Sequence, residues 1–301
     1  MSTAVPPRAL AWLLVLTLVW GTNWMLFPLA VREVSVWTFR AVSMTAAGLF
    51  LLLLARWRGL PLALPAIHRP RIVAAALVYL ALWNVASTYA AVLIPSGQAA
   101  LLGFTMPLWA ALISFAVLGE RLSGRMLMAL ALGAAGVALL MWRSLGAYAQ
   151  APLGVALGLL AAIGWAVGTL ILKRGGALGV SALVLTGWQM LIAAVPVSVG
   201  AVAFAGSGPF LPSLGSVLLI AYIALVPMGL GNLAWFSIVG LLPASVAGLG
   251  SIMVPVVAMI AGAIVHGEPL GAVQWAAMAC CAGGLALALL RPSAPGSPSG
   301  R

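Results

Sequence analysis

The chain has 301 residues, of which 64% are apolar and only 6% are charged, and its mean hydropathy is +1.21. About 25% of the residues of a soluble domain are charged. The composition therefore excludes an ordinary water-soluble domain and indicates an integral membrane protein. The net charge of +11 comes from basic residues scattered between apolar blocks. No basic run with interleaved aromatic residues occurs, so no nucleic-acid partner is expected.

Apolar segments long enough to cross a bilayer recur along the whole chain. A spanning helix needs roughly 20 mainly apolar residues. Ten such segments are bounded by Arg, Gly, Pro or Ser, at residues 9–29, 35–55, 71–91, 95–118, 124–142, 153–172, 180–203, 215–238, 243–265 and 271–290. The first is too long for the apolar core of a signal peptide. We therefore predict an all-α membrane protein of ten transmembrane helices, followed by a disordered tail over residues 292–301.

The basic residues predict the orientation, because short cytoplasmic loops are enriched in Lys and Arg. If residues 1–8 are inside, the outer side holds only Arg32 and Arg143. Arg40, in the second apolar segment, is expected to reach up to the outer headgroups. The cytoplasmic side then holds Arg8, Arg56, Arg58, Arg69, Arg71, Arg121, Arg125, Lys173, Arg174, Arg291 and Arg301. Both termini are thus predicted to be cytoplasmic.

An internal repeat relates the two halves of the chain. A shift of 148 residues aligns residues 93–143 with residues 241–291 without a gap, and the same shift pairs Asn84 with Asn232. The shared residues include Pro95/Pro243, Pro107/Pro255, Gly119/Gly267, Glu120/Glu268 and Gly136/Gly284. Five helices per half is an odd number, so the second half enters the membrane upside down. We predict two inverted five-helix repeats, residues 9–143 and 153–291, an arrangement typical of secondary transporters.

Several motifs resemble a known family. They are Trp20-Gly21-Thr22-Asn23, the run PLWAALISFAVLGERL, its repeat PVVAMIAGAIVHGEPL, and the glycine-rich fifth and tenth helices. With these motifs the chain resembles the EamA type of the drug/metabolite transporter superfamily. In size and aromatic content it is most similar to YddG-type exporters of aromatic and other amino acids. The resemblance implies a bacterial inner-membrane location and a central cavity lined mainly by helices 1, 3, 4, 6, 8 and 9.

Polar and aromatic side chains within the predicted helices are the candidates for substrate binding. A polar group is costly in hydrocarbon and tends to face protein or a water-filled cavity. The amides of Asn84 and Asn232 suit a substrate carboxylate or ammonium, and a hydrogen bond that holds the bundle together is the alternative. For each tryptophan the alternative is packing in the core or against lipid. The candidates are Trp20, Asn23, Tyr79, Trp83, Asn84, Gln98, Thr105, Trp109, Trp165, Tyr222, Asn232 and Trp235.

Other residues are predicted to have gating or structural roles. Pro107 and Pro255 are expected to kink helices 4 and 9 at matched positions and so to gate movement. Glu120 and Glu268 each precede a helix N-terminus, where negative charge is favourable, and are interpreted as structural. No cluster of His, Cys, Asp or Glu has the spacing of a metal site, so neither a metal nor a cofactor is expected.

The predicted function is the export of small metabolites, aromatic or other neutral amino acids in particular, by alternating access. No Asp, Glu, Lys or His is expected at mid-membrane, so a facilitator driven by the substrate's own gradient is predicted. One alternative is a superfamily transporter of drugs, nucleotide sugars or phosphorylated metabolites. Another is an integral membrane enzyme, although no catalytic constellation is visible in the sequence. The expected partners are a small-molecule substrate and the bilayer, and both a monomer and a dimer remain open.

Overall fold

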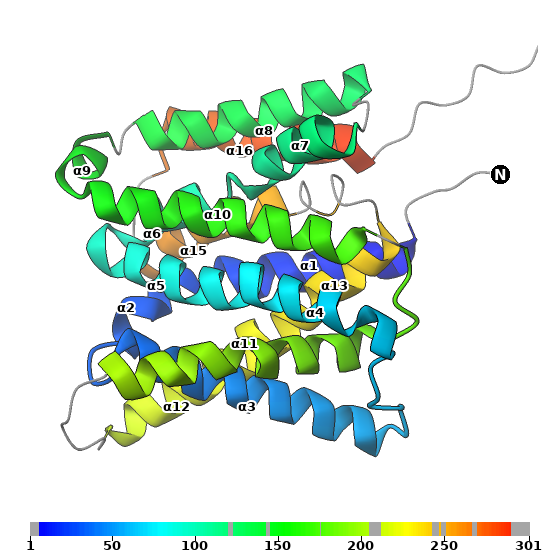
Figure 1. Ribbon diagram of the computed structural model, residues 1–301. Helices are drawn as coiled ribbons and strands as arrows, with labels where there is room; N and C mark the ends of the chain where they lie inside the picture. Colours follow the sequence, from blue (N-terminus) through cyan, green and yellow to red (C-terminus); the bar gives the residue numbers. More distant parts are fainter. Residues whose placement is uncertain are drawn as a thin grey trace, which may run out of the picture.

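The computed structural model describes residues 6–119, 123–142, 145–174, 176–204, 212–242, 247, 251–266 and 270–289. All regular elements in these ranges are helical (Figure 1). Eight helical segments are long and apolar enough to cross a membrane, at residues 7–30, 36–57, 66–93, 98–117, 124–142, 152–173, 182–204 and 214–241. Their bounds agree with the first eight predicted segments to within a few residues. Two more apolar helices follow, α15 (Val254–His266) and α16 (Ala272–Leu289).

The first segment crosses in pieces and not as one helix. It consists of α1 (Pro7–Gly21), the 3-10 turn η1 (Trp24–Leu26) and the short α2 (Phe27–Ala30). Thr22 and Asn23 form the break, and the Thr22 hydroxyl donates back to the carbonyl oxygen of Leu18 at 2.9 Å. Such back-bonding often bends a helix. The break lies in the Trp-Gly-Thr-Asn motif noted in the sequence.

The third and eighth segments each contain a π-helix in their middle. The third comprises η2 (Ala66–His68), α4 (Arg69–Ala75), the π-helix η3 (Ala76–Ala81) and α5 (Leu82–Leu93). The eighth comprises α12 (Leu214–Ile223), the π-helix η4 (Ala224–Leu230) and α13 (Gly231–Leu241). π-Helices are rare and are frequently found at functional sites. The two begin 148 residues apart, the shift of the sequence repeat, and are followed by Asn84 and Asn232.

The fourth segment is divided at Phe104 and Thr105 into α6 (Ser96–Gly103) and α7 (Met106–Leu118). Pro107 lies in the first turn of α7. The backbone N–H groups of a first turn have no acceptor within the helix, so a proline, which lacks an N–H, is tolerated there. Pro255 is likewise the second residue of α15, which follows the 3-10 turn η5 (Ser251–Met253). Each proline therefore lies in the first turn of an α-helix that follows an interruption of the α-helical geometry. Their role in gating stays a prediction. Glu120 and Glu268 lie outside the described residues.

Helices from the two halves of the chain pack in matched pairs. The helix α3 (Val36–Trp57) lies along α11 (Ala182–Phe204), and α8 (Gly124–Trp142) lies along α16. In Figure 1 these pairs occupy opposite edges of the bundle. Between them α10 (Pro152–Lys173) packs on α5, and α1 packs on α13. The start of α1 and the end of α16 lie on the same side, and the short α9 (Leu145–Gln150) lies on the other.

The contact between α3 and α11 is reciprocal at two glycines. A Cβ on Gly48 would lie 2.8 Å from the side chain of Leu191 and 3.0 Å from the carbonyl oxygen of Gly187. A Cβ on Gly187 would lie 2.8 Å from the side chain of Leu52 and 3.3 Å from the carbonyl oxygen of Gly48. Small residues allow such close backbone approach in membrane helices. Each helix thus presents the same glycine-and-leucine arrangement to the other.

Candidate functional site

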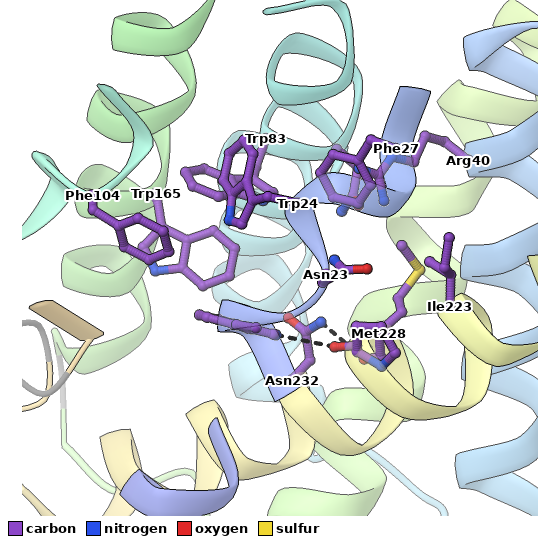
Figure 2. A pocket seen from close by; sticks show the side chains of 13 residues that line it. Asn23, Trp24, Phe27, Arg40, Trp83, Phe104, Trp165, Ile223, Met228 and Asn232 are labelled. Atoms are coloured by element: carbon purple, nitrogen blue, oxygen red, sulfur yellow. Dashed lines mark hydrogen bonds between the residues drawn. The ribbon is translucent and has the colours of Figure 1, made fainter. Parts of the chain in front are cut away.

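A small cavity lies between α1, α2, α3, α5, α10 and the eighth segment, with a water-accessible volume of about 40 Å³. Its lining residues are Trp20, Asn23, Trp24, Phe27, Arg40, Trp83, Asn84, Phe104, Trp165, Ile223, Pro227, Met228 and Asn232. We call this space the central cavity. Figure 2 shows Phe104 and Trp165 at one end and Arg40 at the other. A volume of this size holds only a few water molecules.

Indole rings form one wall of the central cavity. The ring centroid of Trp165 lies 5.3 Å from that of Trp20, 4.8 Å from Trp83 and 5.4 Å from Trp235. Tyr79 adds an edge contact to Trp165 at 4.9 Å. Pairs of this kind contribute about 0.5–1.5 kcal/mol each beyond their burial. Trp165 is therefore the centre of a cohesive group, which we call the aromatic cluster: Trp20, Tyr79, Trp83, Trp165 and Trp235.

Asn84 and Asn232 present oxygen atoms, because their amide nitrogens are already engaged. The Nδ2 of Asn84 donates to the carbonyl oxygen of Leu80 at 2.8 Å, and the Nδ2 of Asn232 donates to that of Met228 at 2.9 Å. A backbone carbonyl only accepts, so the NH₂ must face it and Oδ1 must point elsewhere. These amide nitrogens bond within their own helices and do not bridge two helices. The Oδ1 atoms of Asn232 and Asn23 are buried without a hydrogen-bond partner.

Arg40 lies inside the bundle, and the expectation that it reaches the outer headgroups is wrong. Its side chain is 2% exposed. Its Nε donates to the hydroxyl of Thr88 at 2.6 Å, and its guanidinium carbon lies 4.2 Å from the ring centre of Phe27 and 4.7 Å from that of Phe39. One terminal nitrogen, Nη2, is buried without a partner. The side chain turns inward to the hydroxyl of Thr88 on α5 and the ring of Phe27 on α2.

No acidic side chain pairs with Arg40 within the described part of the chain. The three acidic residues of the sequence are Glu33, Glu120 and Glu268, and the last two are not among the described residues. The carboxylate of Glu33 lies in the loop after α2, where it accepts from the backbone N–H of Ser213 at 2.6 Å and from its hydroxyl at 2.9 Å. These hydrogen bonds, the backbone one foremost, lower the pKa of Glu33. Glu33 is thus engaged elsewhere.

Eight of the candidates from the sequence come together at this site. Six line the central cavity, namely Trp20, Asn23, Trp83, Asn84, Trp165 and Asn232. Tyr79 and Trp235 lie behind the lining rings, and the Oη of Tyr79 and the Nε1 of Trp235 are buried without partners. The sequence reasoning missed Trp24, Phe27, Arg40, Phe104, Ile223, Pro227 and Met228 as lining residues. Arg40 had a usable signal, because an ionisable residue within a membrane segment indicates a functional site by default.

The other four candidates lie outside the central cavity. The Thr105 hydroxyl donates to the carbonyl oxygen of Leu102 at 2.6 Å and accepts from the indole N–H of Trp109 at 3.1 Å. Gln98 lies on α6, where its backbone carbonyl oxygen accepts from the hydroxyl of Tyr148. Tyr222 is 43% exposed on α12. The π-helix η4 lies between Tyr222 and Asn232, so α-helical spacing does not describe how these two side chains are oriented relative to each other.

A larger hollow opens on the side where α1 begins, with a water-accessible volume of about 680 Å³. We call it the vestibule; it is lined by Arg8, Trp12, Leu172, Lys173, Gly176, Ala177, Leu178, Gly179, Val180, Ala182, Leu185, Phe236, Ser237, Val239, Gly240 and Leu241. The ring of Phe236 lies 5.6 Å from that of Tyr79. Since Trp20 and Trp165 line the central cavity and Tyr79 packs between Trp165 and Phe236, the aromatic cluster lies between the two spaces.

Comparison with known sequences identifies the family. The EamA-like transporter family matches the chain twice, over residues 7–142 and 152–290. The uncharacterized transporter YvbV of Bacillus subtilis is 28% identical over 85% of this chain and 83% of its own. The probable amino-acid metabolite efflux pump of Escherichia coli is 30% identical over 60% of this chain and 63% of its own. The uncharacterized inner membrane transporter YedA of E. coli is 28% identical over 88% and 85%.

A solved crystal structure has the same fold. It superposes with a TM-score of 0.74 at 21% identity, over 93% of this chain and 96% of its own. The double match covers most of the chain, and the eight apolar helical segments agree with a membrane location. The chain belongs to the EamA-like transporter family of membrane transporters.

Proposed function

We propose that the protein exports small metabolites, in particular amino acids with aromatic or other neutral side chains, by alternating access through the central cavity. The observation that carries this proposal is the composition of the cavity. Indole rings of Trp20, Trp83 and Trp165 offer an apolar surface. Beside them the Oδ1 atoms of Asn23 and Asn232, which have no hydrogen-bond partner, are available to accept from a substrate. The printed name of the E. coli efflux pump supports the same substrate class. The resemblance to YddG-type exporters implies the same substrate class.

We propose further that the chain forms ten transmembrane helices as two inverted repeats. The two family matches, one per half, support the repeat. The π-helices η3 and η4 begin at equivalent positions, and Asn84 and Asn232 make equivalent bonds. A Cβ on Gly136 would lie 3.0 Å from the carbonyl oxygen of Ala277, and one on Gly284 would lie 2.8 Å from that of Ala129. Reciprocal contacts of this kind are expected of two halves related by a two-fold axis.

The aromatic cluster serves in this proposal as the inner gate. The vestibule faces the cytoplasm, since both termini are assigned to that side of a bacterial inner membrane, and the name of the relative YedA agrees with that membrane. Movement of one half against the other opens the rings toward the vestibule and then closes them again. The site contains no carboxylate among the described residues, so the substrate's own gradient drives the cycle.

Counterflow in proteoliposomes tests this proposal. Vesicles loaded with unlabelled L-phenylalanine, L-tryptophan or L-leucine are diluted into the radiolabelled amino acid, and transient accumulation is measured. We expect counterflow of at least one of them, and a loss of more than tenfold in Trp165→Ala and Asn232→Ala. Trp57→Ala is the matched control, since Trp57 is 82% exposed at the end of α3. Absence of counterflow for every amino acid would overturn the proposal, and a strong accumulation driven by an imposed proton gradient would overturn its facilitator mechanism.

A further inference from the structure

We propose that Arg40 binds the carboxylate of the transported molecule, and that the amide oxygens of Asn23 and Asn232 receive its ammonium group. The central cavity would then select zwitterions with an apolar side chain. This inference rests on the proposed function and names the chemical group by which the substrate is recognised. It starts from an observation that transport alone does not explain: a buried cation with no acidic partner in the described part of the chain.

A buried guanidinium without a counter-charge is costly. Removing an ion from water costs several kcal/mol even after the protein relaxes, unless an opposite charge compensates it. The faces of Phe27 and Phe39 recover part of this cost by cation–π attraction. One hydroxyl bond and two rings do not neutralise the charge. An anionic group that enters the cavity would neutralise the charge of Arg40. It would not need to displace water from the guanidinium, because Arg40 is already desolvated.

The guanidinium of Arg40 is held in place by a hydrogen bond from its Nε, while its Nη2 makes no hydrogen bond. The Thr88 hydroxyl accepts from Nε of Arg40 at 2.6 Å and donates to the carbonyl oxygen of Asn84 at 2.7 Å. Because its proton goes to that carbonyl, Thr88 must accept from Arg40. Nη2 remains without a partner. A guanidinium can bind a carboxylate through two parallel N–H bonds, which adds specificity as well as energy.

The acceptors lie away from this cation, toward the rings. Figure 2 shows Asn23 and Asn232 between the aromatic residues and Met228, with Arg40 beyond Phe27. The Oδ1 atoms of Asn23 and Asn232 are buried without partners, which is unfavourable until a donor arrives. An ammonium group carries three donors and no acceptor. The cavity therefore has a cationic end and an acceptor region, which match the two charges of an amino acid.

The same arrangement opposes other substrate classes. A cationic amine would meet Arg40 without a compensating carboxylate. A phosphate dianion would find one guanidinium and no second cation among the residues that line the cavity. The carboxylate of an amino acid balances the single charge of Arg40, and the uncharged side chain of the same amino acid packs on the rings of the aromatic cluster.

The test uses the purified full-length protein and three related probes. L-phenylalanine has both charged groups, L-phenylalaninamide lacks the carboxylate, and 3-phenylpropionate lacks the ammonium. Binding is measured by quenching of intrinsic tryptophan fluorescence, and inhibition of L-phenylalanine counterflow is measured in parallel. We expect L-phenylalaninamide to bind about 10- to 100-fold more weakly than L-phenylalanine, the usual effect of losing a charged hydrogen bond. Equal binding of the two would overturn the inference, whatever any variant does.

The variants add an independent comparison. Arg40→Gln should weaken L-phenylalanine and 3-phenylpropionate by a similar factor and leave L-phenylalaninamide unchanged. Asn232→Leu should weaken only the two probes with an ammonium group. Arg56→Gln is the control, because Arg56 is an exposed arginine on the same helix. Melting temperatures monitor folding, and Arg40→Lys keeps the charge if Arg40→Gln does not fold.

The outcomes separate the two proposals. Amino-acid counterflow that is unchanged in Arg40→Gln would overturn the role of Arg40 and leave the proposed function standing. A parent protein that exchanges no amino acid would overturn the proposed function. Uniform weakening of all three probes by Arg40→Gln would assign Arg40 to the architecture of the bundle, and would overturn the carboxylate role.

Discussion

The indole N–H of Trp20 in α1 donates a hydrogen bond to the backbone carbonyl oxygen of Pro227 in η4, 3.0 Å away. The two residues are 207 positions apart, so this bond joins the first helix of the first half to the π-helix of the second. Trp20 also stacks on Trp235, with ring centroids 6.0 Å apart and planes inclined by 27°. Trp20 therefore contacts the eighth segment twice, through the backbone of Pro227 and through the ring of Trp235.

Gly231 is expected to be essential for the position of Trp20. A Cβ at Gly231 would overlap the indole nitrogen of Trp20, so Gly231→Ala must displace the ring and break its bond to Pro227. Overpacking of this kind costs typically about 1–3 kcal/mol. We expect a lower melting temperature and an altered tryptophan emission. Gly240→Ala on the same helix α13 is the control, since nothing lies within 4 Å of a Cβ there. Equal spectra for the two variants would contradict this placement of Trp20.

Trp165→Ala is expected to destabilise the protein more than the same change at the surface. Trp165 is 2% exposed and contacts four aromatic rings, whereas Trp142 is 76% exposed. Truncating a buried tryptophan costs about 3–5 kcal/mol. Thermal unfolding in detergent should show a large loss for Trp165→Ala and almost none for Trp142→Ala. A comparable small loss in both would mean that the aromatic cluster does not hold the bundle together.

Gly48→Ala and Gly187→Ala are expected to have similar effects, because each new methyl group meets a leucine at 2.8 Å on the opposite helix. Each should lower stability by about 1–3 kcal/mol. The double variant should depart from additivity, since both changes act on one helix contact. Melting temperatures of the two single variants and the double variant check this, with Gly124→Ala as a control at an open position. Clearly unequal single effects would contradict the reciprocal packing of these two glycines.

The link between Glu33 and Ser213 predicts a pH dependence. Hydrogen bonds from Ser213 lower the pKa of the Glu33 carboxyl in the folded protein. Its stabilisation is therefore present above the unfolded pKa, about 4.3, and is lost as the pH falls through the lower folded value. The parent should melt above Glu33→Gln at pH 7, and the difference should vanish in acid. A difference that does not shrink as the Glu33 carboxyl becomes protonated would contradict the role of the ionised carboxylate.

The helices that depend on apolar length could be predicted from the sequence. Segments such as residues 124–142 are bounded by polar or glycine-rich stretches, and their described bounds follow these limits. The pairing of Asn84 with Asn232 could also be predicted, because it needs only the repeat. The helix bounds depend on local composition, and the pairing of Asn84 with Asn232 depends on the repeat shared by the two halves.

The local departures from α-helical geometry could not be predicted. The break at Thr22 and Asn23 and the π-helices η3 and η4 alter which residues share a face, as Tyr222 illustrates. Periodicity assumes one turn length along a segment and therefore cannot detect such changes. The prediction for Arg40 is wrong for another reason. A long side chain near a membrane boundary can extend outward or inward. Only the tertiary contacts with Thr88 and Phe27 decide between the two directions.

The smallness of the central cavity also bears on the electrical insulation of the membrane. Protons cross proteins along unbroken files of water, and a space of about 40 Å³ holds too few molecules to form one. The indoles interrupt any such file toward the vestibule, and the positive charge of Arg40 repels a hydronium ion at the other end. Fixed positive charge excludes protons from selective pores in the same way. A cell that keeps many copies of this protein in its membrane would thus lose little of its membrane potential while they are at rest.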